Sequence, residues 1–277
     1  MRRPASSVCA VLAWLLVSAP ADVALAQTEV GGTIVYSPPL RVCAAPDNLP
    51  YSDKAGDGFE NKLAEMVAKD LGTSVAYTWY PEHPGFIRQT LGAGECDVVM
   101  GVPDIDGVEA TRSYYRSGYV FVSRPGRGLT FSSMSDPELK SLRIGVSLIG
   151  ADGAGTPPAV ALGRQGIFAQ VKGFPVYGDG SDSARLADPI RAVESGAVDV
   201  AAVWGPIAGY YARQTQPPLR VTPITDTDAF LPQIFQYPIA MGVRPGDDDL
   251  KDRLDSFISR HRAEIKALLQ SYGVPLL

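Results

Sequence analysis

Histidine and cysteine are scarce in this sequence, and their scarcity limits the chemistry that the chain can carry. Its 277 residues include two histidines, His83 and His261, and three cysteines. No Ser-His-Asp or Cys-His pairing is apparent, and no cysteine belongs to a CxxC pair, the spacing typical of zinc and redox sites. The sequence therefore predicts neither a catalytic triad nor a cofactor or metal site, although paired carboxylates could still support a dehydration.

An excess of positive charge is also missing. Lysine and arginine number 25 against 30 aspartates and glutamates, which gives a formal net charge of −5 at pH 7. Binding to nucleic acid or to an anionic membrane surface depends on clustered Lys and Arg side chains. The mild acidity therefore argues against both kinds of partner, whereas the apolar content of 45% is ample for packed cores.

Long hydrophobic runs are absent beyond the N-terminus. Residues 1–26 have the features of an export signal: a charged start, an apolar stretch over 8–19 and an Ala-Leu-Ala cleavage site that ends at Ala26. No later segment approaches the roughly 20 uninterrupted apolar residues that a membrane-spanning helix needs. The sequence predicts a soluble, periplasmic mature chain without membrane insertion.

Two cysteines, Cys43 and Cys96, remain outside the signal, since Cys9 falls within it. In an oxidising compartment a disulfide between them is favoured over a metal or redox site, because neither a CxxC spacing nor a histidine cluster accompanies them. Two buried thiols are the alternative. A lipid-anchored cysteine is not indicated, because Cys9 does not stand at the cleavage point.

The mature chain alternates strand-like and helix-like segments. Strands are expected over 40–45, 74–80 and 97–102, with a helix over 58–72 and a shorter helical segment over 85–94. A βαβαβ series of this kind predicts right-handed crossovers and a mainly parallel sheet.

The same series occurs a second time at a fixed offset. LRIGVS begins at Leu142 where LRVCAA begins at Leu40, and SGAVDVAAV (195–203) matches AGECDVVMG (93–101), so both offsets are 102 residues. Two matches at one offset are harder to attribute to chance than one. They predict an α/β protein of two similar lobes, each a mainly parallel sheet flanked by helices.

Two extended segments join the predicted lobes. One covers 119–128; the other begins at residue 237 and leads into a final helix with apolar residues at helical spacing from Leu250 to Leu269. Two crossings make a hinge, and the returning chain should complete the first lobe. The expected division is a signal peptide over 1–26, a first lobe over 27–120 and 238–277, and a second lobe over 121–237.

The segments in this order resemble a known family. The likeness lies in GFENKLAEMVAKDLG, FIRQTLGAGECDVVMG, LKSLRIGVSLIG and IAMGVRPGDDDLKDRLDSFI, which are similar to periplasmic solute-binding proteins of family 3, with a type II two-lobed fold, across residues 38–273. More narrowly, RVCAAPDNLPYS, GVPDIDGVEATRSYYRSGYVFVSR and VWGPIAGYYA resemble the MoxJ/XoxJ-type branch associated with quinoprotein methanol dehydrogenases. The resemblance implies a periplasmic partner, a PQQ-dependent methanol or alcohol dehydrogenase.

The chain departs from the amino-acid receptors of this family at two positions. The resemblance implies an arginine for the α-carboxylate of the ligand and an acid in the opposite lobe for its ammonium group. An ungapped comparison instead places Glu109 at the arginine position and Trp204 at the acid position, although Arg112 takes the arginine position in a gapped one. Free amino acids are therefore poor candidate ligands, because a buried ammonium without a counter-ion is destabilised by several kcal/mol.

Candidate ligand-binding residues follow the strand ends, where open α/β sheets bind ligands. Trp204 either fills the cleft and packs on neighbouring tyrosines or stacks on an apolar or aromatic ligand or partner side chain. The turn residues of 45–52 are ordinary turn formers as well, and Asp152 lies in a Gly-rich segment whose N–H groups could bind an anion. The candidates are Asp47, Asn48, Tyr51, Tyr80, Asp104, Arg112, Tyr115, Asp152 and Trp204.

Three functions remain open. The first is a non-catalytic binding protein that assists or partners a PQQ dehydrogenase, with a small molecule or a protein segment in its cleft. The second is a receptor that delivers a small solute, not a standard amino acid, to an ABC permease. The third, ranked last, is a periplasmic enzyme on the same fold, similar to cyclohexadienyl dehydratases. Co-purification with a dehydrogenase, saturable thermal stabilisation by a solute and turnover of cyclohexadienyl acids distinguish them.

Overall fold

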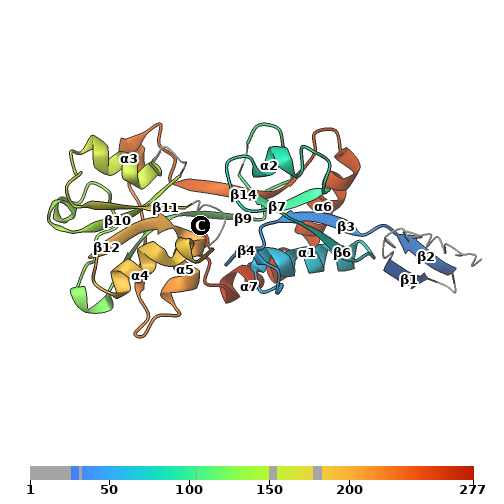
Figure 1. Cartoon of the computed structure of the whole chain (residues 1–277), viewed down its shortest axis with the longest axis horizontal. Coiled ribbons are helices and arrows are strands. Elements are labelled where there is room, and N and C mark those ends of the chain that lie inside the picture. The colour runs from blue at the N-terminus through green and yellow to red at the C-terminus, as the bar shows by residue number, and fades with distance from the viewer. Residues whose placement is uncertain (1–25, 31–32, 104, 150–154, 177–182) are drawn as a thin grey trace, which may run out of the picture.

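Two α/β lobes lie side by side in the computed structural model, joined by two long strands, β9 (Tyr115–Ser123) and β14 (Gln236–Val243) (Figure 1). The structure describes residues 26–30, 33–103, 105–149, 155–176 and 183–277. The N-terminal segment predicted to be an export signal therefore lies almost wholly outside the described residues. Within the described parts of the chain, no helix is both long and apolar enough to cross a membrane.

The first lobe contains a mainly parallel sheet with helices on both faces (Figure 1). Strand β3 pairs in parallel with β6 and β7, and β14 runs antiparallel to β7. A hairpin of β1 (Ala26–Val30) and β2 (Thr33–Ser37) precedes this sheet. The elements of the lobe are β3 (Leu40–Ala44), β4 (Asp47–Asn48), β5 (Ser52–Asp53), α1 (Phe59–Asp70), β6 (Val75–Trp79), α2 (Phe86–Gln89), β7 (Val98–Val102), β8 (Glu109–Ala110), α6 (Asp248–Arg260) and α7 (Arg262–Ser271).

Helix α1 shows why these residues form these elements. Phe59, Leu63 and Val67 recur every four residues, so they share one face of the helix, and all three are almost fully buried. They pack in one cluster with residues of α6 and α7 such as Leu254 and Ile265. The apolar spacing predicted the helix, and burial against the C-terminal helices stabilises it.

The second lobe repeats this plan. Strand β10 pairs in parallel with β11 and β12, and β9 runs antiparallel to β12. Alternate residues of β12 face opposite layers: Val200 and Ala202 pack in the cluster that includes α3, and Ala201 and Val203 in the cluster that includes α4 and α5. The elements of the lobe are η2 (Pro137–Ser141), β10 (Ile144–Leu148), α3 (Pro157–Arg164), β11 (Val171–Pro175), α4 (Asp188–Glu194), β12 (Val200–Trp204), α5 (Gly205–Ala212) and β13 (Arg220–Pro223).

The connection between the lobes is the pair of strands β9 and β14. Over Tyr115–Gly118 and Gln236–Ile239 they pair with each other in antiparallel register. After Gly118, β9 pairs with β12 and β13; after Ile239, β14 pairs with β7 and β8. One continuous sheet path, β11-β10-β12-β9-β14-β7-β3-β6, therefore runs through both lobes, and the two crossing strands form the hinge.

The 102-residue repeat has a structural counterpart at the start of each parallel sheet. In the first lobe, the Arg41 backbone N–H and guanidinium donate to the Asp97 carboxylate, with 3.1 Å from Nε to Oδ2. In the second, Arg143 binds Asp199 through the same atoms, again with 3.1 Å from Nε to Oδ2. A bidentate guanidinium fixes the carboxylate in orientation as well as charge, so each pair joins the first strand of its lobe to the strand beside it.

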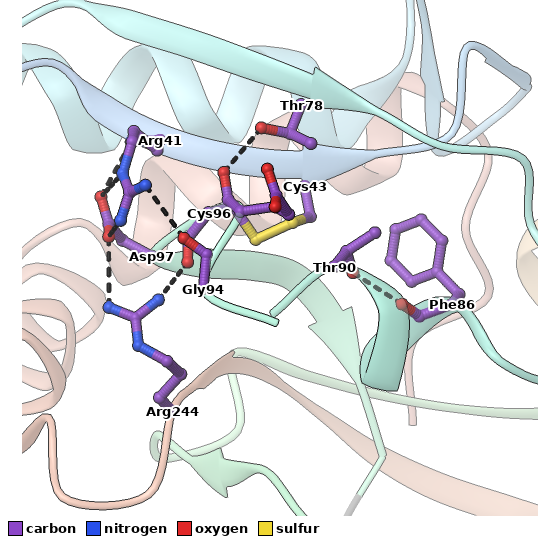
Figure 2. Close-up of a disulfide and its surroundings, with 10 residues drawn as sticks. Arg41, Cys43, Thr78, Phe86, Thr90, Gly94, Cys96, Asp97 and Arg244 are labelled. Carbon is purple, nitrogen blue, oxygen red and sulfur yellow. Dashed lines mark hydrogen bonds and ion pairs between the residues drawn. A yellow bond between two sulfur atoms is a disulfide. The ribbon is translucent and has the colours of Figure 1, made fainter. Parts of the chain in front are cut away.

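The two cysteines form the predicted disulfide. Cys43 in β3 and Cys96 just before β7 are bonded, with their Cα atoms 5.5 Å apart. Both are almost fully buried beside Phe86 and Leu91, so the alternative of two free buried thiols is wrong. Figure 2 shows the bond next to Asp97 and its arginines, which places a covalent link and an ion-pair cluster between the same two strands.

Two helical predictions need correction. The segment over 85–94 contains only the four-residue α2, which ends where the Thr90 backbone leaves helical geometry (φ −117°, ψ −84°). The single final helix is in fact two, α6 and α7, with a break at His261. There the imidazole hydrogen-bonds Asp70, the last residue of α1, as well as Glu264. A tertiary contact therefore interrupts a continuous apolar pattern.

The residues after α7 pass along the hinge towards the second lobe, where the C-terminus lies between the lobes (Figure 1). Ser117 in β9 donates to the Pro275 carbonyl (2.6 Å), and the Leu277 N–H donates to the Arg116 carbonyl (3.1 Å). Gly273 lies against Gly209 of α5 so closely that a Cβ on Gly209 would meet its carbonyl oxygen at 1.8 Å. Only glycine permits this approach.

Candidate functional site

A cavity of about 470 Å³ lies between the lobes, within the range common for small-molecule sites. Strand ends of both lobes reach it: β3 through Cys43 and Ala44, β10 through Ser147 and β12 through Trp204. This is the position that the parallel arrangement predicts, because ligands bind beyond the carboxyl ends of such strands.

Aromatic rings form much of the cavity wall. They come from a loop and a helix of the first lobe, from the two crossing strands and from the end of β12. Trp204 is the central one: its ring centroid lies 5.4 Å from that of Tyr119 and 5.8 Å from that of Tyr237, both edge-to-face. The aromatic lining residues are Tyr51, Phe86, Tyr115, Tyr119, Trp204 and Tyr237.

Trp204 owes its position to the strand-to-helix turn that follows it. Its backbone is extended (φ −65°, ψ 132°), and Gly205 and Pro206 begin α5 immediately afterwards, since proline is favoured in the first turn of a helix. A Cβ at Gly205 would lie 2.6 Å from the Gly118 carbonyl oxygen, so glycine is needed for α5 to begin this close to β9. Trp204 is half-buried and faces the cavity.

Tyr51 and Tyr115 shape the first-lobe side of the cavity. Both pack around Phe59, with ring centroids 5.4 and 6.3 Å away. Burial raises the pKa of each hydroxyl well above 10, so both are neutral hydrogen-bonding groups. The Trp204 indole lies close enough to the Tyr51 hydroxyl across the cleft to oppose slightly the rise of its pKa.

Two glutamates are the acids of the lining. Glu60 is the second residue of α1, and the first N–H groups of this helix donate to the Pro50 and Tyr51 carbonyls at 2.9 Å, which fixes the helix start beside the Tyr51 loop. Burial, reinforced by the nearby Glu82, raises the pKa of Glu60 to about 8. Glu82 is an exposed residue of the wall, and partial desolvation raises the pKa of its carboxyl to about 7.

Counter-charges for these acids are missing from the cavity wall. None of the described residues that line it is lysine, arginine or histidine. The remaining polar groups are the side chains of Asn48, Ser52, Ser147 and Thr156, of which Ser52 and Thr156 already donate to backbone carbonyls. The described wall therefore has no group that could clamp a carboxylate with paired charge.

Comparison with known proteins places the chain in a family. The model of the bacterial extracellular solute-binding protein family matches residues 79–273. The protein MoxJ of Methylorubrum extorquens strain AM1 is 34% identical over 86% of this chain and 81% of its own length. The chain belongs to the MoxJ family of bacterial extracellular solute-binding proteins.

Two solved structures of similar proteins support the assignment of this chain to the MoxJ family. The periplasmic binding protein XoxJ from Methylobacterium extorquens AM1 superimposes with a TM-score of 0.72 at 34% identity, over 86% of this chain and 99% of XoxJ. MxaJ from Methlophaga aminisulfidivorans MPT gives a TM-score of 0.74 at 28% identity, over 86% of this chain and all of MxaJ. The type II periplasmic binding-protein fold expected from the sequence is confirmed.

Four of the nine candidate residues line the cavity of the MoxJ-family protein: Asn48, Tyr51, Tyr115 and Trp204. Trp204 was expected either to pack on neighbouring tyrosines or to face a ligand, and in the structure it does the first while also facing the cavity. Its ring contacts Tyr119 and Tyr237, and it is also part of the open wall. Asp104 and Asp152 lie outside the described residues.

The structure places three further candidates away from the cavity. Asp47 is exposed in the short hairpin of β4 and β5. The Tyr80 hydroxyl donates to Gln89 on α2. Arg112 faces α6, where its guanidinium donates to Ser259 (2.8 Å) and its backbone N–H to Asp255 (2.6 Å).

Glu109, which the ungapped comparison placed at the receptor arginine's position, is not among the described residues that line the cavity. Glu109 lies in the edge strand β8 and accepts a hydrogen bond from the Gly246 N–H. Arg112 does not replace the clamp either, because it is held against α6. The conclusion that this chain lacks the carboxylate clamp agrees with the described wall.

Sequence reasoning missed Glu60, Tyr119 and Tyr237. Glu60 stands in the first turn of a helix, where acids are common because they interact favourably with the helix dipole. The two tyrosines stand in strands whose sequence is typical of the hydrophobic core. Glu82 follows a strand end and could have been included on that signal. No group of three or more potential metal ligands occurs among the described residues.

Proposed function

We propose that this MoxJ-family protein is a non-catalytic periplasmic binding protein that assists or partners a PQQ-dependent methanol or alcohol dehydrogenase. The resemblance to the dehydrogenase-associated branch and the family membership support this role. We further propose export through the segment over 1–26, and lobes bounded at 27–120, 121–237 and 238–277. The crossing of β9 and β14 between lobes near Gly118 and Ile239 supports these bounds.

The observation that carries the proposal is a cavity with aromatic walls and two acids but no described basic side chain. A receptor for free amino acids has to neutralise the carboxylate of its ligand, and a bidentate arginine is the group best suited to do so. A carboxylate placed beside Glu60 and Glu82 would lose its hydration without gaining a positive partner, and any ionised fraction of the two acids would repel it. A conventional amino-acid receptor is therefore disfavoured.

The two glutamates also provide the strongest argument for an enzyme. Carboxyl groups with pKa values raised to about 8 and about 7 can donate protons near neutral pH. Cyclohexadienyl acids, however, are themselves carboxylates and would need a positive group to hold them. The described wall supplies none, which favours a binding role over dehydration.

The decisive test is association with the dehydrogenase. Full-length protein, exported from its own host and carrying an affinity tag, is expected to co-purify with a PQQ-dependent dehydrogenase. Deletion of its gene is expected to lower the dehydrogenase activity of periplasmic extracts, with restoration by the intact gene as control. Normal activity in the deletion strain together with no co-purification would contradict the proposal. Turnover of a cyclohexadienyl acid by the purified protein would contradict its non-catalytic part.

A further inference from the structure

Glu60 lies in a narrow place on the cavity wall. A Cβ at Gly101 in β7 would lie 2.1 Å from Glu60 Oε1, so the carboxyl group occupies space that only a glycine at this position leaves free. No hydrogen bond or ion pair to the Glu60 carboxyl is found among the described residues. The carboxyl group is thus positioned by packing against backbone, not by a charged partner.

The titratable groups around Glu60 all carry negative charge when ionised. The negative charge of ionised Glu60 raises the pKa of four nearby tyrosines, which lie in the loop before α1, in β6, just before β9 and in β9. The charge of Glu82, which follows β6, in turn raises the pKa of Glu60. None is a cation. The neighbours are Tyr51, Tyr77, Glu82, Tyr114 and Tyr115.

Three internal stretches outside the described residues also lack basic side chains. Residue 104 is Asp, 150–154 reads GADGA and 177–182 reads YGDGSD, so these stretches contribute aspartates and no lysine, arginine or histidine. Since no described residue of the wall is basic, a cationic ligand or a cationic group of a partner would supply the missing counter-charge.

The aromatic wall is suited to the same kind of ligand. The faces of Trp and Tyr rings attract cations, and rings arranged around a cavity are a recognised way to hold alkylated ammonium groups. Trp204 meets Tyr119 and Tyr237 edge-to-face, and Tyr51 of the first lobe lines the same cavity. Carboxylates for the charge and rings for the alkyl groups occur in one cavity.

We propose that the cavity binds an organic cation with an alkylammonium group, with Glu60 and Glu82 as its counter-ions and Trp204 and its neighbouring tyrosines against its alkyl part. This inference deepens the proposed binding function and rests on it. The cation is either a free amine or a lysine side chain of the dehydrogenase, since both present the same chemistry.

Binding of the cation is coupled to release of protons. At pH 7 Glu60 holds its proton, since its pKa is raised to about 8, whereas the exposed Glu82 holds its proton about half of the time, with a pKa of about 7. A cation favours the ionised form of both. For each proton released on binding, the association constant rises about tenfold per pH unit below the pKa. Affinity at pH 8 should therefore exceed affinity at pH 6 by roughly 10-fold if Glu82 alone loses its proton on binding, about 50-fold if Glu60 alone does, and about 500-fold if both do.

The experiment is a calorimetric titration of the purified protein at pH 6 and pH 8. The probe is n-butylammonium, and n-butanol and butyrate are its neutral and anionic counterparts. We expect saturable binding of n-butylammonium that is tighter at pH 8, little binding of n-butanol and none of butyrate. Glu60→Gln and Glu82→Gln keep the side-chain volume and should each weaken binding by about tenfold or more. Glu65→Gln is the matched control, because Glu65 is exposed on the same helix and pairs with Lys62.

A second arm distinguishes the two sources of the cation. If n-butylammonium binds but leaves co-purification of the dehydrogenase unaffected, the ligand is a free amine. If it displaces the dehydrogenase, and if Glu60→Gln and Glu82→Gln but not Glu65→Gln weaken the complex, the ligand is a lysine side chain.

Equal binding of n-butanol and n-butylammonium would overturn the inference. So would unchanged binding by both glutamine variants, or no binding of n-butylammonium together with a complex that both variants leave intact. Failure of the wild-type protein to bind any dehydrogenase would overturn the proposed function, and the calorimetric arm would still decide whether the cavity selects cations.

Discussion

Replacing Glu60 by glutamine is expected to stabilise the protein in alkaline solution. Glutamine has nearly the same volume and remains neutral at every pH. The folded chain holds the Glu60 proton up to about pH 8, whereas the ordinary glutamate value is 4.5. The unfolded chain thus releases the proton first, and the free energy of unfolding of the wild-type protein falls as the pH rises from about 4.5 to about 8. Above that range the folded protein contains an ionised Glu60 without a counter-ion.

The magnitude follows from the pKa difference. A shift from 4.5 to about 8 corresponds to about 5 kcal/mol at about 1.4 kcal/mol per unit. This is an upper value, because water in the cavity and relaxation of the wall reduce the penalty of the charge. We expect Glu60→Gln to exceed the wild type by on the order of 3 kcal/mol at pH 9, and to differ little from it at pH 4, where both side chains are neutral.

Urea unfolding at pH 4, 7 and 9, followed by circular dichroism, measures this difference. Glu65→Gln serves as the control, since its surface pair with Lys62 contributes less than about 0.5 kcal/mol. A gap between Glu60→Gln and wild type that stays constant from pH 4 to pH 9 would refute the reasoning. A variant that is less stable than the wild type at pH 9 would mean that the ionised carboxylate has a favourable partner.

Three further predictions concern stability and ligand sensing. Reduction of the Cys43–Cys96 disulfide, which spans 53 positions, should lower the free energy of unfolding by about 2–5 kcal/mol, measured by urea unfolding with and without reductant; an unchanged midpoint would contradict its stabilising role. Asp199→Asn should lower the free energy of unfolding by about 1 kcal/mol at pH 7, because hydrogen bonding by arginine holds the pKa of Asp199 at about 2 and water around the half-exposed arginines screens part of the ion-pair energy. This loss should shrink as the pH falls from 3.8 towards 2, and a pH-independent loss would show that charge is not its cause. Binding of n-butylammonium should change tryptophan fluorescence in the wild type and in Trp79→Phe but not in Trp204→Phe, because Trp204 lines the cavity; the reverse pattern would locate the ligand elsewhere.

Most of the fold could be predicted because its signals are local. The apolar spacing of α1 is contained in twelve consecutive residues, and the repeat at 102 residues marks two lobes without any knowledge of their contacts. The break at His261 could not be found in this way, since the apolar spacing continues from Phe257 to Ile265. It depends on Asp70, which is 191 residues away in the chain and reaches His261 only after folding.

The site was partly predictable for a related reason. Strand ends gather at one edge of a parallel sheet, so Tyr51 and Trp204 could be assigned to a cleft from their places in the chain. The same rule does not say which way a side chain turns, and Arg112 turns to α6. Glu60 was missed because an acid in the first turn of a helix has an ordinary structural explanation, and only the folded arrangement shows that its carboxyl group faces the cavity.

The passage of Gly273–Leu277 along the hinge gives the lobes a third point of attachment. Two strands alone allow both bending and twisting between the bodies that they join. A further contact to one side of them, with the backbones of Gly209 and Gly273 touching, opposes the twist and leaves bending about a single axis. When the lobes open and close about this axis, Tyr51 and Trp204 should return to the same relative orientation each time, so every closure would form the same pocket.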